Sequence, residues 1–197
     1  MLVDFDGTVI KGDSFFRFLW HAYGPWGRFL RFGKALLPLM RYRLGGWDAH
    51  RAKEAIFGIF FGGWSRARFE AYCQWFAASV LPRMERPAAV KALAAHLERG
   101  DEVWLVSASP EPYLRAWAEP KGIRVMATAV AYDANGRLTG RFASANCRGN
   151  EKVRRIQARL DLSRYSDITA YGDSLEDRPM LALAHHAYYR PFRDKAD

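Results

Sequence analysis

The chain has 197 residues, of which 50% are hydrophobic, and a formal net charge of +9 at pH 7. This length suits one α/β domain with a sizeable insertion, and it is enough to bury a substantial core. The two cysteines, Cys73 and Cys147, are too few and too isolated for a disulfide framework or a zinc site, which favours a reducing, cytoplasmic setting.

The chain opens with a strand, predicted at residues 2–5, that carries acidic residues where its apolar run ends. Asp4 and Asp6 are two positions apart, so in an extended chain they project to the same side, and Gly7 allows a sharp turn beside them. Two carboxylates this close repel each other unless they share a proton or a cation, for which Mg²⁺ is the simplest candidate. The alternative is an ordinary Asp-Gly turn with hydrated carboxylates. We expect no signal peptide, although the shortness of this strand leaves open a native start upstream of Met1.

Residues 13–86 have helical spacing, many aromatic residues and no convincing strand. One apolar stripe at helical spacing is formed by Trp26, Phe29, Leu30, Gly33, Leu37, Met40 and Leu44. The stretch from Ser14 to Trp47 has no acidic residue, and its basic residues are Arg17, Arg28, Arg31, Lys34, Arg41 and Arg43. Pro38 is expected to kink or interrupt the helix.

A basic amphipathic helix with Trp and Phe is typical of segments that lie in a membrane interface. We therefore hypothesise a peripheral contact with the inner membrane face through residues 15–44. The alternative is that the apolar stripe packs against other helices while the arginines form a solvated face. Nucleic acid is an unlikely partner, because the basic residues are interleaved with bulky apolar ones and no nucleic-acid motif is present.

Residues 87–197 alternate helix and strand, and together with residues 2–5 they predict an α/β fold with a parallel sheet. The expected elements are a helix at 88–99, a strand at 103–106, a helix at 113–121, a strand at 124–130, an Asn-Gly hairpin at 133–137, a helix at 151–160, a strand around Ile168 and an edge strand at 187–189. In an open α/β sheet, ligands bind at the carboxyl ends of the strands, which is where the polar residues of this chain gather.

Three polar segments occupy such positions. Ser107-Ala108-Ser109-Pro110 ends one strand, Gly172-Asp173-Ser174 ends another with Asp177 close behind, and Gly149-Asn-Glu-Lys152 opens a helix between them. Each has an ordinary alternative: Ser107 as a helix cap, Lys152 as a solvated lysine and Asp173 as a turn residue.

The chain resembles the haloacid dehalogenase-like (HAD) superfamily, in the branch of the phosphoserine phosphatases. The matching motifs are the D-x-D-x-T box at Asp4, Asp6 and Thr8, the motif-two serine at Ser107, the motif-three lysine at Lys152, and the acidic box at Gly172, Asp173 and Asp177. The resemblance implies a Rossmann-like core of residues 1–12 and 87–197, with a helical cap at 13–86 inserted after the first motif. Such a cap shields the reaction and selects the substrate.

The resemblance implies phosphoryl transfer by the first acidic pair. Asp4 would attack phosphorus and form an aspartyl-phosphate, while Asp6 would protonate the leaving oxygen and then deprotonate the hydrolytic water. Dehalogenases of this superfamily lack the second acidic residue and the metal, so Asp6 favours phosphatase chemistry. A sugar phosphomutase would use the same box and is disfavoured by analogy alone.

The resemblance also implies the remaining ligands. Asp4, the backbone carbonyl of Asp6 and Asp173 would hold Mg²⁺, with Asp177 supporting the metal shell. Lys152 and Ser107 would bind the phosphoryl oxygens, and the amides after Ser107, at Ala108 and Ser109, would add an anion-binding helix start. Thr8 is expected beside the substrate.

The substrate is less well indicated. Phosphoserine phosphatases carry a Glu nine positions after the nucleophile to hold the substrate ammonium; Asp13 stands there in this chain, and it could instead cap a helix beginning at Ser14. A related HAD group with a G-x-E-K third motif, similar to Gly149 to Lys152, dephosphorylates phosphatidylglycerophosphate. A lipid phosphate is therefore our first hypothesis and a soluble phosphate ester our second. A third is a catalytically idle protein that binds a membrane or nucleic acid.

Overall fold

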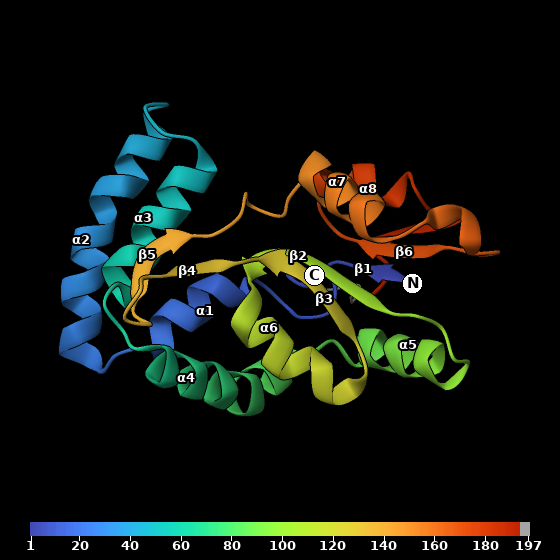
Figure 1. The fold of residues 1–197 in the computed structure, drawn as a ribbon, viewed down its shortest axis with the longest axis horizontal. Helices are drawn as coiled ribbons and strands as arrows, with labels where there is room; N and C mark the ends of the chain where they lie inside the picture. Colours follow the sequence, from blue (N-terminus) through green and yellow to red (C-terminus); the bar gives the residue numbers. More distant parts are fainter. Residues whose placement is uncertain (194–197) are drawn as a thin grey trace.

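The computed structural model describes residues 1–193, and its centre is a parallel five-stranded sheet with the order β3-β2-β1-β6-β7 (Figure 1). The strands are β1 (Leu2–Val3), β2 (Trp104–Pro110), β3 (Arg124–Thr128), β6 (Thr169–Gly172) and β7 (His186–Tyr189). Every neighbouring pair in this sheet is parallel, so the expected α/β fold with a parallel sheet is confirmed.

Helices cover both faces of the sheet (Figure 1). One face carries α5 (Pro87–Glu98) and α6 (Glu111–Ala118), and the other carries α7 (Asn150–Arg159) and α8 (Arg178–Leu181). Short 3₁₀ turns are η2 (Glu119–Lys121), η3 (Leu162–Arg164) and η4 (Leu175–Asp177). Neighbouring strand residues point to opposite faces, so Leu2 packs in the cluster with Ile156 and Met180, whereas Val3 packs in the cluster with Leu114. Burial on both faces explains why these strands read as continuous apolar runs.

A helical block follows β1, as the spacing predicts. It consists of α1 (Ser14–His21), α2 (Pro25–Arg43), α3 (Ala49–Phe61), α4 (Arg66–Ser79) and the 3₁₀ turn η1 (Leu81–Arg83). Asp13, Asp48 and Ser65 start three of these helices by accepting a hydrogen bond from the amide three residues on. Phe18, at the centre of the block, packs against an aromatic cluster made of Phe61, Phe69, Tyr72, Phe76 and Tyr113.

The predicted interruption at Pro38 is wrong, because α2 runs through it to Arg43. Pro38 is one of the two buried residues of α2, and the helix continues for five residues beyond it although its ring offers no amide hydrogen. None of the helices in residues 1–193 combines the length and the apolar character needed to cross a membrane. Both cysteines are buried and free.

The Asn-Gly hairpin forms β4 (Val130–Tyr132) and β5 (Leu138–Phe142), which pair antiparallel. It lies against the helical block rather than on the main sheet (Figure 1). A Cβ on Gly140, whose φ is +81°, would stand 2.7 Å from the Cα of Gly58 on α3, so the two backbones touch. Backbone hydrogen bonds of 2.8 Å also join Leu138 to Gly63 and to Trp64. The division into a core and a cap ending at residue 86 stays a prediction, and residues 194–197 of that core lie outside the described residues.

Candidate active site

Three carboxylates gather at the carboxyl edge of the sheet. Asp4 follows β1, whereas Asp173 and Asp177 follow β6, and one carboxylate oxygen from each lies within 4.8 Å of the others. Adjacent parallel strands end at the same edge, which is why residues 169 positions apart meet here. All three side chains are buried or nearly so, so their mutual repulsion is little screened by water.

Lys152 holds two of these carboxylates together. Its Nζ donates to Oδ1 of Asp4 and to Oδ1 of Asp177, both at 2.6 Å, and its side chain is 2% exposed. Lys152 is therefore no solvated surface lysine. Burial alone would lower its pKa, but the carboxylates of Asp4 and Asp177 outweigh burial and raise it, so the lysine stays charged.

Asp4 and Asp177 respond to the same environment in opposite directions. Burial raises the pKa of Asp4 to about 7, against the opposing effect of Lys152. Burial also acts to raise the pKa of Asp177, but Lys152 and hydrogen bonds from Ser174 hold it below its ordinary value. Oδ2 of Asp177 accepts from the amides of Asp173 and Ser174 and from the Ser174 hydroxyl, which makes Asp177 the residue that shapes this turn.

Asp6 faces a different set of partners. Its Oδ1 accepts from the Ser14 amide at 2.5 Å and its Oδ2 from the Ser109 hydroxyl at 2.6 Å. The Ser14 hydroxyl in turn is 3.2 Å from that of Ser109 and 2.8 Å from that of Tyr113. Burial, followed by the nearby charge of Asp13, raises the pKa of Asp6. A carboxyl group that keeps its proton more readily than usual is suited to act as a general acid.

Gly7 makes the turn between the two aspartates and leaves room for the third carboxylate. Its φ is +80°, and a Cβ at this position would lie 2.4 Å from Oδ2 of Asp173. Arg193 donates to the same oxygen at 2.7 Å, and Arg86 donates to the Gly7 carbonyl at 3.2 Å. The Asp-Gly pair is thus more than a hydrated turn, because it permits the close approach of Asp173.

We expect Gly7→Ala to lower the free energy of unfolding by more than the roughly 1–2 kcal/mol that a left-handed Ala costs, because the Cβ also displaces Asp173. Gly12→Ala is the matched control, since Gly12 has a φ of +77° and nothing within 4 Å of its added Cβ. Urea denaturation of both variants measures the two losses. Equal losses would show that the space beside Asp173 is not restrictive.

The segment after the second motif differs from its prediction. Ser107, Ala108 and Ser109 all belong to β2, and α6 begins only at Glu111. The Ser109 amide donates to Oγ of Ser107 at 3.1 Å. The expected helix start directly after Ser107 is therefore wrong, because the strand continues to Pro110, whose ring has no amide hydrogen to offer.

The structure also shows where the two remaining predicted residues lie. The Thr8 hydroxyl donates to Oδ2 of Asp4 at 3.4 Å. Asp13 caps α1 by accepting a hydrogen bond from the Phe16 amide at 2.9 Å, which confirms its predicted alternative role as a helix cap. Its negative charge also helps to raise the pKa of Asp6.

One residue of the helical block reaches the site without any signal in the sequence. Lys53 of α3 donates from Nζ to the Ala108 carbonyl at 2.8 Å, and its charge is felt by Asp6 and Asp13. Burial lowers the pKa of Lys53 and the two aspartates oppose this. The sequence did not indicate Lys53 because it belongs to no motif and lies 55 positions from Ala108 along the chain.

The carboxylate cluster fits a hard divalent cation. Asp4, Asp173 and Asp177 offer oxygen donors of the kind that Mg²⁺ prefers, close enough for one ion to contact more than one of them. Among residues 1–193 this is the one group of His, Cys, Asp and Glu side chains with such spacing.

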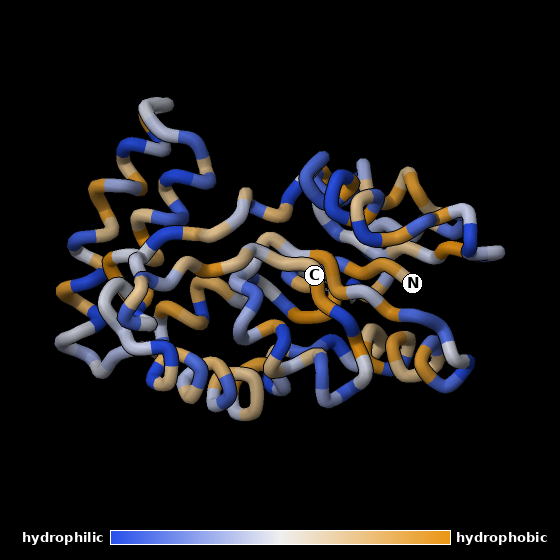
Figure 2. Tube along the Cα trace, in the orientation of Figure 1, coloured by the Kyte–Doolittle hydropathy of each residue, from blue (hydrophilic) through white to orange (hydrophobic). Residues whose placement is uncertain are grey.

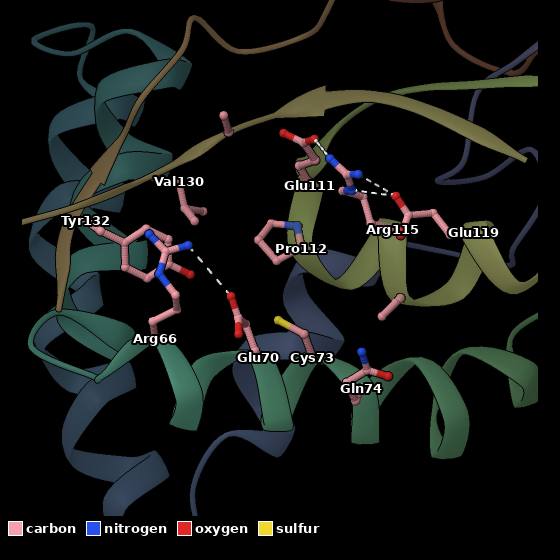
Figure 3. Close-up of a pocket in the computed structure, with 12 residues that line it drawn as sticks. Arg66, Glu70, Cys73, Gln74, Glu111, Pro112, Arg115, Glu119, Val130 and Tyr132 are labelled. Atoms are coloured by element: carbon pink, nitrogen blue, oxygen red, sulfur yellow. Dashed lines mark hydrogen bonds and ion pairs between the residues drawn. The ribbon is translucent and has the colours of Figure 1, made fainter. Parts of the chain in front are cut away.

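A pocket of about 380 Å³ lies elsewhere, between α4, α6 and β4 (Figure 3). Its charged residues are paired with one another: Arg66 lies 3.7 Å from Glu70, and Arg115 lies 3.2 Å from Glu111 and 2.6 Å from Glu119. The clustered carboxylates do not line this pocket, so it is distinct from the site at the sheet edge.

Comparisons with known proteins place this site in a family. The haloacid dehalogenase-like hydrolases match residues 1–182. Protein CicA of Caulobacter vibrioides is 33% identical over 198 aligned residues, which cover 98% of this chain and 86% of that protein. A crystal structure of a protein of unknown function from Bordetella pertussis Tohama I is similar with a TM-score of 0.76 and 25% identity, covering 93% of this chain and 85% of that one.

The fold is also that of a substrate-bound phosphoserine phosphatase, with a TM-score of 0.62 at 16% identity, covering 93% of this chain and 81% of that one. The family match and this likeness agree with the resemblance drawn from the motifs. The chain belongs to the haloacid dehalogenase-like hydrolases and has the fold of their phosphoserine phosphatase-like branch.

Proposed function

We propose that this HAD hydrolase is a Mg²⁺-dependent phosphomonoesterase that works through an aspartyl-phosphate on Asp4. The observation that carries the proposal is the buried contact of Asp4 with Lys152, 2.6 Å long, inside a cluster of three carboxylates. Burying a lysine and a carboxylate together costs desolvation free energy, so we interpret this pair as retained for its chemistry. Phosphoryl transfer needs a nucleophile and a cation at one point.

In the first step, a carboxylate oxygen of Asp4 attacks phosphorus and the bond from phosphorus to the ester oxygen breaks. Asp6 gives its proton to that oxygen, so the substrate leaves as an alcohol. In the second step, water attacks phosphorus while Asp6 takes back a proton, and the bond from phosphorus to Asp4 breaks to release inorganic phosphate. Lys152 keeps its positive charge throughout and stabilises the phosphoryl oxygens.

Two neighbouring groups support this assignment. The Ser14 amide and the Ser109 hydroxyl each donate to one oxygen of the Asp6 carboxyl group and so fix its orientation. Asp4, the Asp6 carbonyl, Asp173 and Asp177 would hold Mg²⁺, which when bound polarises the phosphoryl group and offsets its negative charge. The Ser107 hydroxyl and the backbone of Ala108 and Ser109 line the expected phosphate position.

The substrate that we propose is a lipid phosphomonoester such as phosphatidylglycerophosphate. The helical block at residues 13–86 would act as the cap over the site, and its long basic and apolar helix, α2, suits a substrate that resides in a membrane. A small soluble phosphate ester is the second candidate, favoured by the position of Asp13, which could hold a substrate ammonium beside Asp6.

We expect Mg²⁺ to be required for phosphate release. A panel should pair the lipid phosphate in mixed micelles with phosphoserine, a sugar phosphate and an aryl phosphate. EDTA should lower every rate by at least about 100-fold, and excess Mg²⁺ should restore it. Mg²⁺ should also raise the melting temperature, because it neutralises the clustered carboxylates.

Selective turnover of the lipid would support the first substrate class, and a soluble preference the second. Absence of turnover across the panel, despite a thermal shift with Mg²⁺, would overturn the enzymatic proposal in favour of a protein that only binds. Turnover that survives EDTA would contradict the metal requirement alone.

A further inference from the structure

The outward side of α2 is apolar, which reverses the usual arrangement of a surface helix. The buried residues of α2 are Ala35 and Pro38, which mark its inner side. Trp26, Phe29 and Leu44 are 82%, 72% and 82% exposed. The other exposed large apolar residues of α2 are Leu30, Leu36, Leu37, Leu39, Met40 and Tyr42.

Helical geometry puts six of these residues, counting Leu44 at the C-cap, on one face, whereas Leu36, Leu39 and Tyr42 lie outside it. At 3.6 residues per turn, positions 26, 29, 30, 37, 40 and 44 fall within one stripe, about half a turn away from Ala35. In Figure 2, hydrophobic positions recur along α2 between hydrophilic ones. We call this stripe the outer face of α2. The reading in which it packs against other helices is contradicted, because α2 meets α3 through its inner side.

The charged residues of α2 are all positive. Lys34, Arg41 and Arg43 are exposed beside the outer face, and no acidic residue occurs between Ser14 and Trp47. Arg28 lies over the Trp20 ring at 4.1 Å and Arg31 over the Tyr23 ring at 3.5 Å, so these two half-buried cations are held on the inner side, near the start of the helix.

We propose that the outer face of α2 docks on an anionic membrane surface. Its aromatic and aliphatic side chains would enter the boundary between headgroups and acyl chains, and the flanking cations would meet lipid phosphates. This proposal rests on the proposed function, because it gives the proposed phosphatase a membrane partner. Vesicle binding can nevertheless be measured without turnover.

Charge complementarity favours this partner over two others. A second copy of the chain would bring its own positive residues against these, which is repulsive. Nucleic acid would match the cations but not the most exposed side chains, since nucleic-acid interfaces are polar whereas Trp26, Phe29 and Leu44 are apolar. An anionic bilayer offers negative charge at its surface and hydrocarbon just beneath it.

The test is vesicle co-sedimentation of the full chain with phosphatidylcholine alone and with about 30% phosphatidylserine. We expect at least about tenfold tighter binding to the anionic vesicles, and weaker binding as salt is raised. Trp26→Ser with Phe29→Ser should reduce the affinity at least about tenfold, and Lys34→Glu with Arg41→Glu by a similar factor.

Trp75→Ser is the matched control, because Trp75 is a 45% exposed tryptophan of α4 outside the outer face. It should leave vesicle binding unchanged, and all variants should keep the wild-type rate on the soluble aryl phosphate. Absence of turnover by the wild-type chain, with normal vesicle binding, would count against the phosphatase and leave the docking proposal standing.

Absence of vesicle binding, or binding that ignores the outer-face substitutions, would overturn the proposal. Sedimentation velocity provides the remaining outcome. A dimer that is lost on Trp26→Ser with Phe29→Ser, without vesicle binding, would assign the outer face to a second copy of the chain and also overturn it.

Discussion

Asp4→Asn should abolish phosphate release, with a rate loss on the order of 10⁴-fold or more. The amide keeps the size and one acceptor of the carboxylate but cannot form an acyl-phosphate, so the covalent route is closed. Because Asp4 is buried and its pKa is raised to about 7, the neutral side chain should not destabilise the fold. Release of inorganic phosphate from an aryl ester with Mg²⁺ is the measurement, beside the melting temperature.

The control is Asp161→Asn, the same chemical change at an exposed residue that caps η3. It should keep the wild-type rate. Quenching the wild type with acid during turnover should trap phosphate on the protein, and Asp4→Asn should trap none. Activity of Asp4→Asn within tenfold of wild type would mean that another residue is the nucleophile.

Lys152→Met should cost roughly 3–5 kcal/mol of unfolding free energy as well as the activity. The change removes the shared partner of Asp4 and Asp177 and leaves two buried carboxylates facing each other. Urea denaturation measures the loss. Lys91→Met, the same change at an exposed position of α5, should be close to neutral.

The stability loss of Lys152→Met should depend on pH. The folded-state pKa of Asp4 is already raised to about 7 by burial, and removal of Lys152 raises it further. A raised carboxyl pKa favours folding at low pH and disfavours it as pH rises through the folded value, so the loss should be larger at about pH 8 than at about pH 5.5. Adding Asp4→Asn should recover part of it. A loss that is small and independent of pH would show that Lys152 does not compensate these charges.

The parallel sheet and its edge could be predicted because they depend on local patterns. Apolar runs mark the strands, and the polar residues that end them must meet once the strands lie parallel. Asp4, Asp173 and Asp177 meet for this reason, although no rule of spacing relates position 4 to position 177. The Asn-Gly hairpin could be predicted for the same reason, because Asp133 and Gly136 form the turn through local interactions.

What could not be predicted depends on tertiary contacts. Ser14 of α1 and Tyr113 of α6 lie 99 positions apart, and only tertiary packing brings their hydroxyls within 2.8 Å of each other, beside the Ser109 hydroxyl that donates to Asp6. The same limit hid Lys53, and it left the apolar stripe of α2 ambiguous, because periodicity shows that a face exists but not what covers it. The local rule that proline ends a helix failed at Pro38, where α2 continues to Arg43.

The backbone contact of Gly58 with Gly140 determines which segments can rotate together as one rigid body. Hydrogen bonds from Phe142 to Glu54 and from Arg66 to the Gly136 carbonyl, each 2.8 Å, lock the hairpin to the same helices. If the helical block rotated relative to the sheet, the hairpin would move with it, and four chain crossings rather than two would join the rotating part to the sheet. One of the crossings is a single residue, Ala129, between β3 and β4. A one-residue connection of this kind would allow the hairpin little displacement from the end of β3.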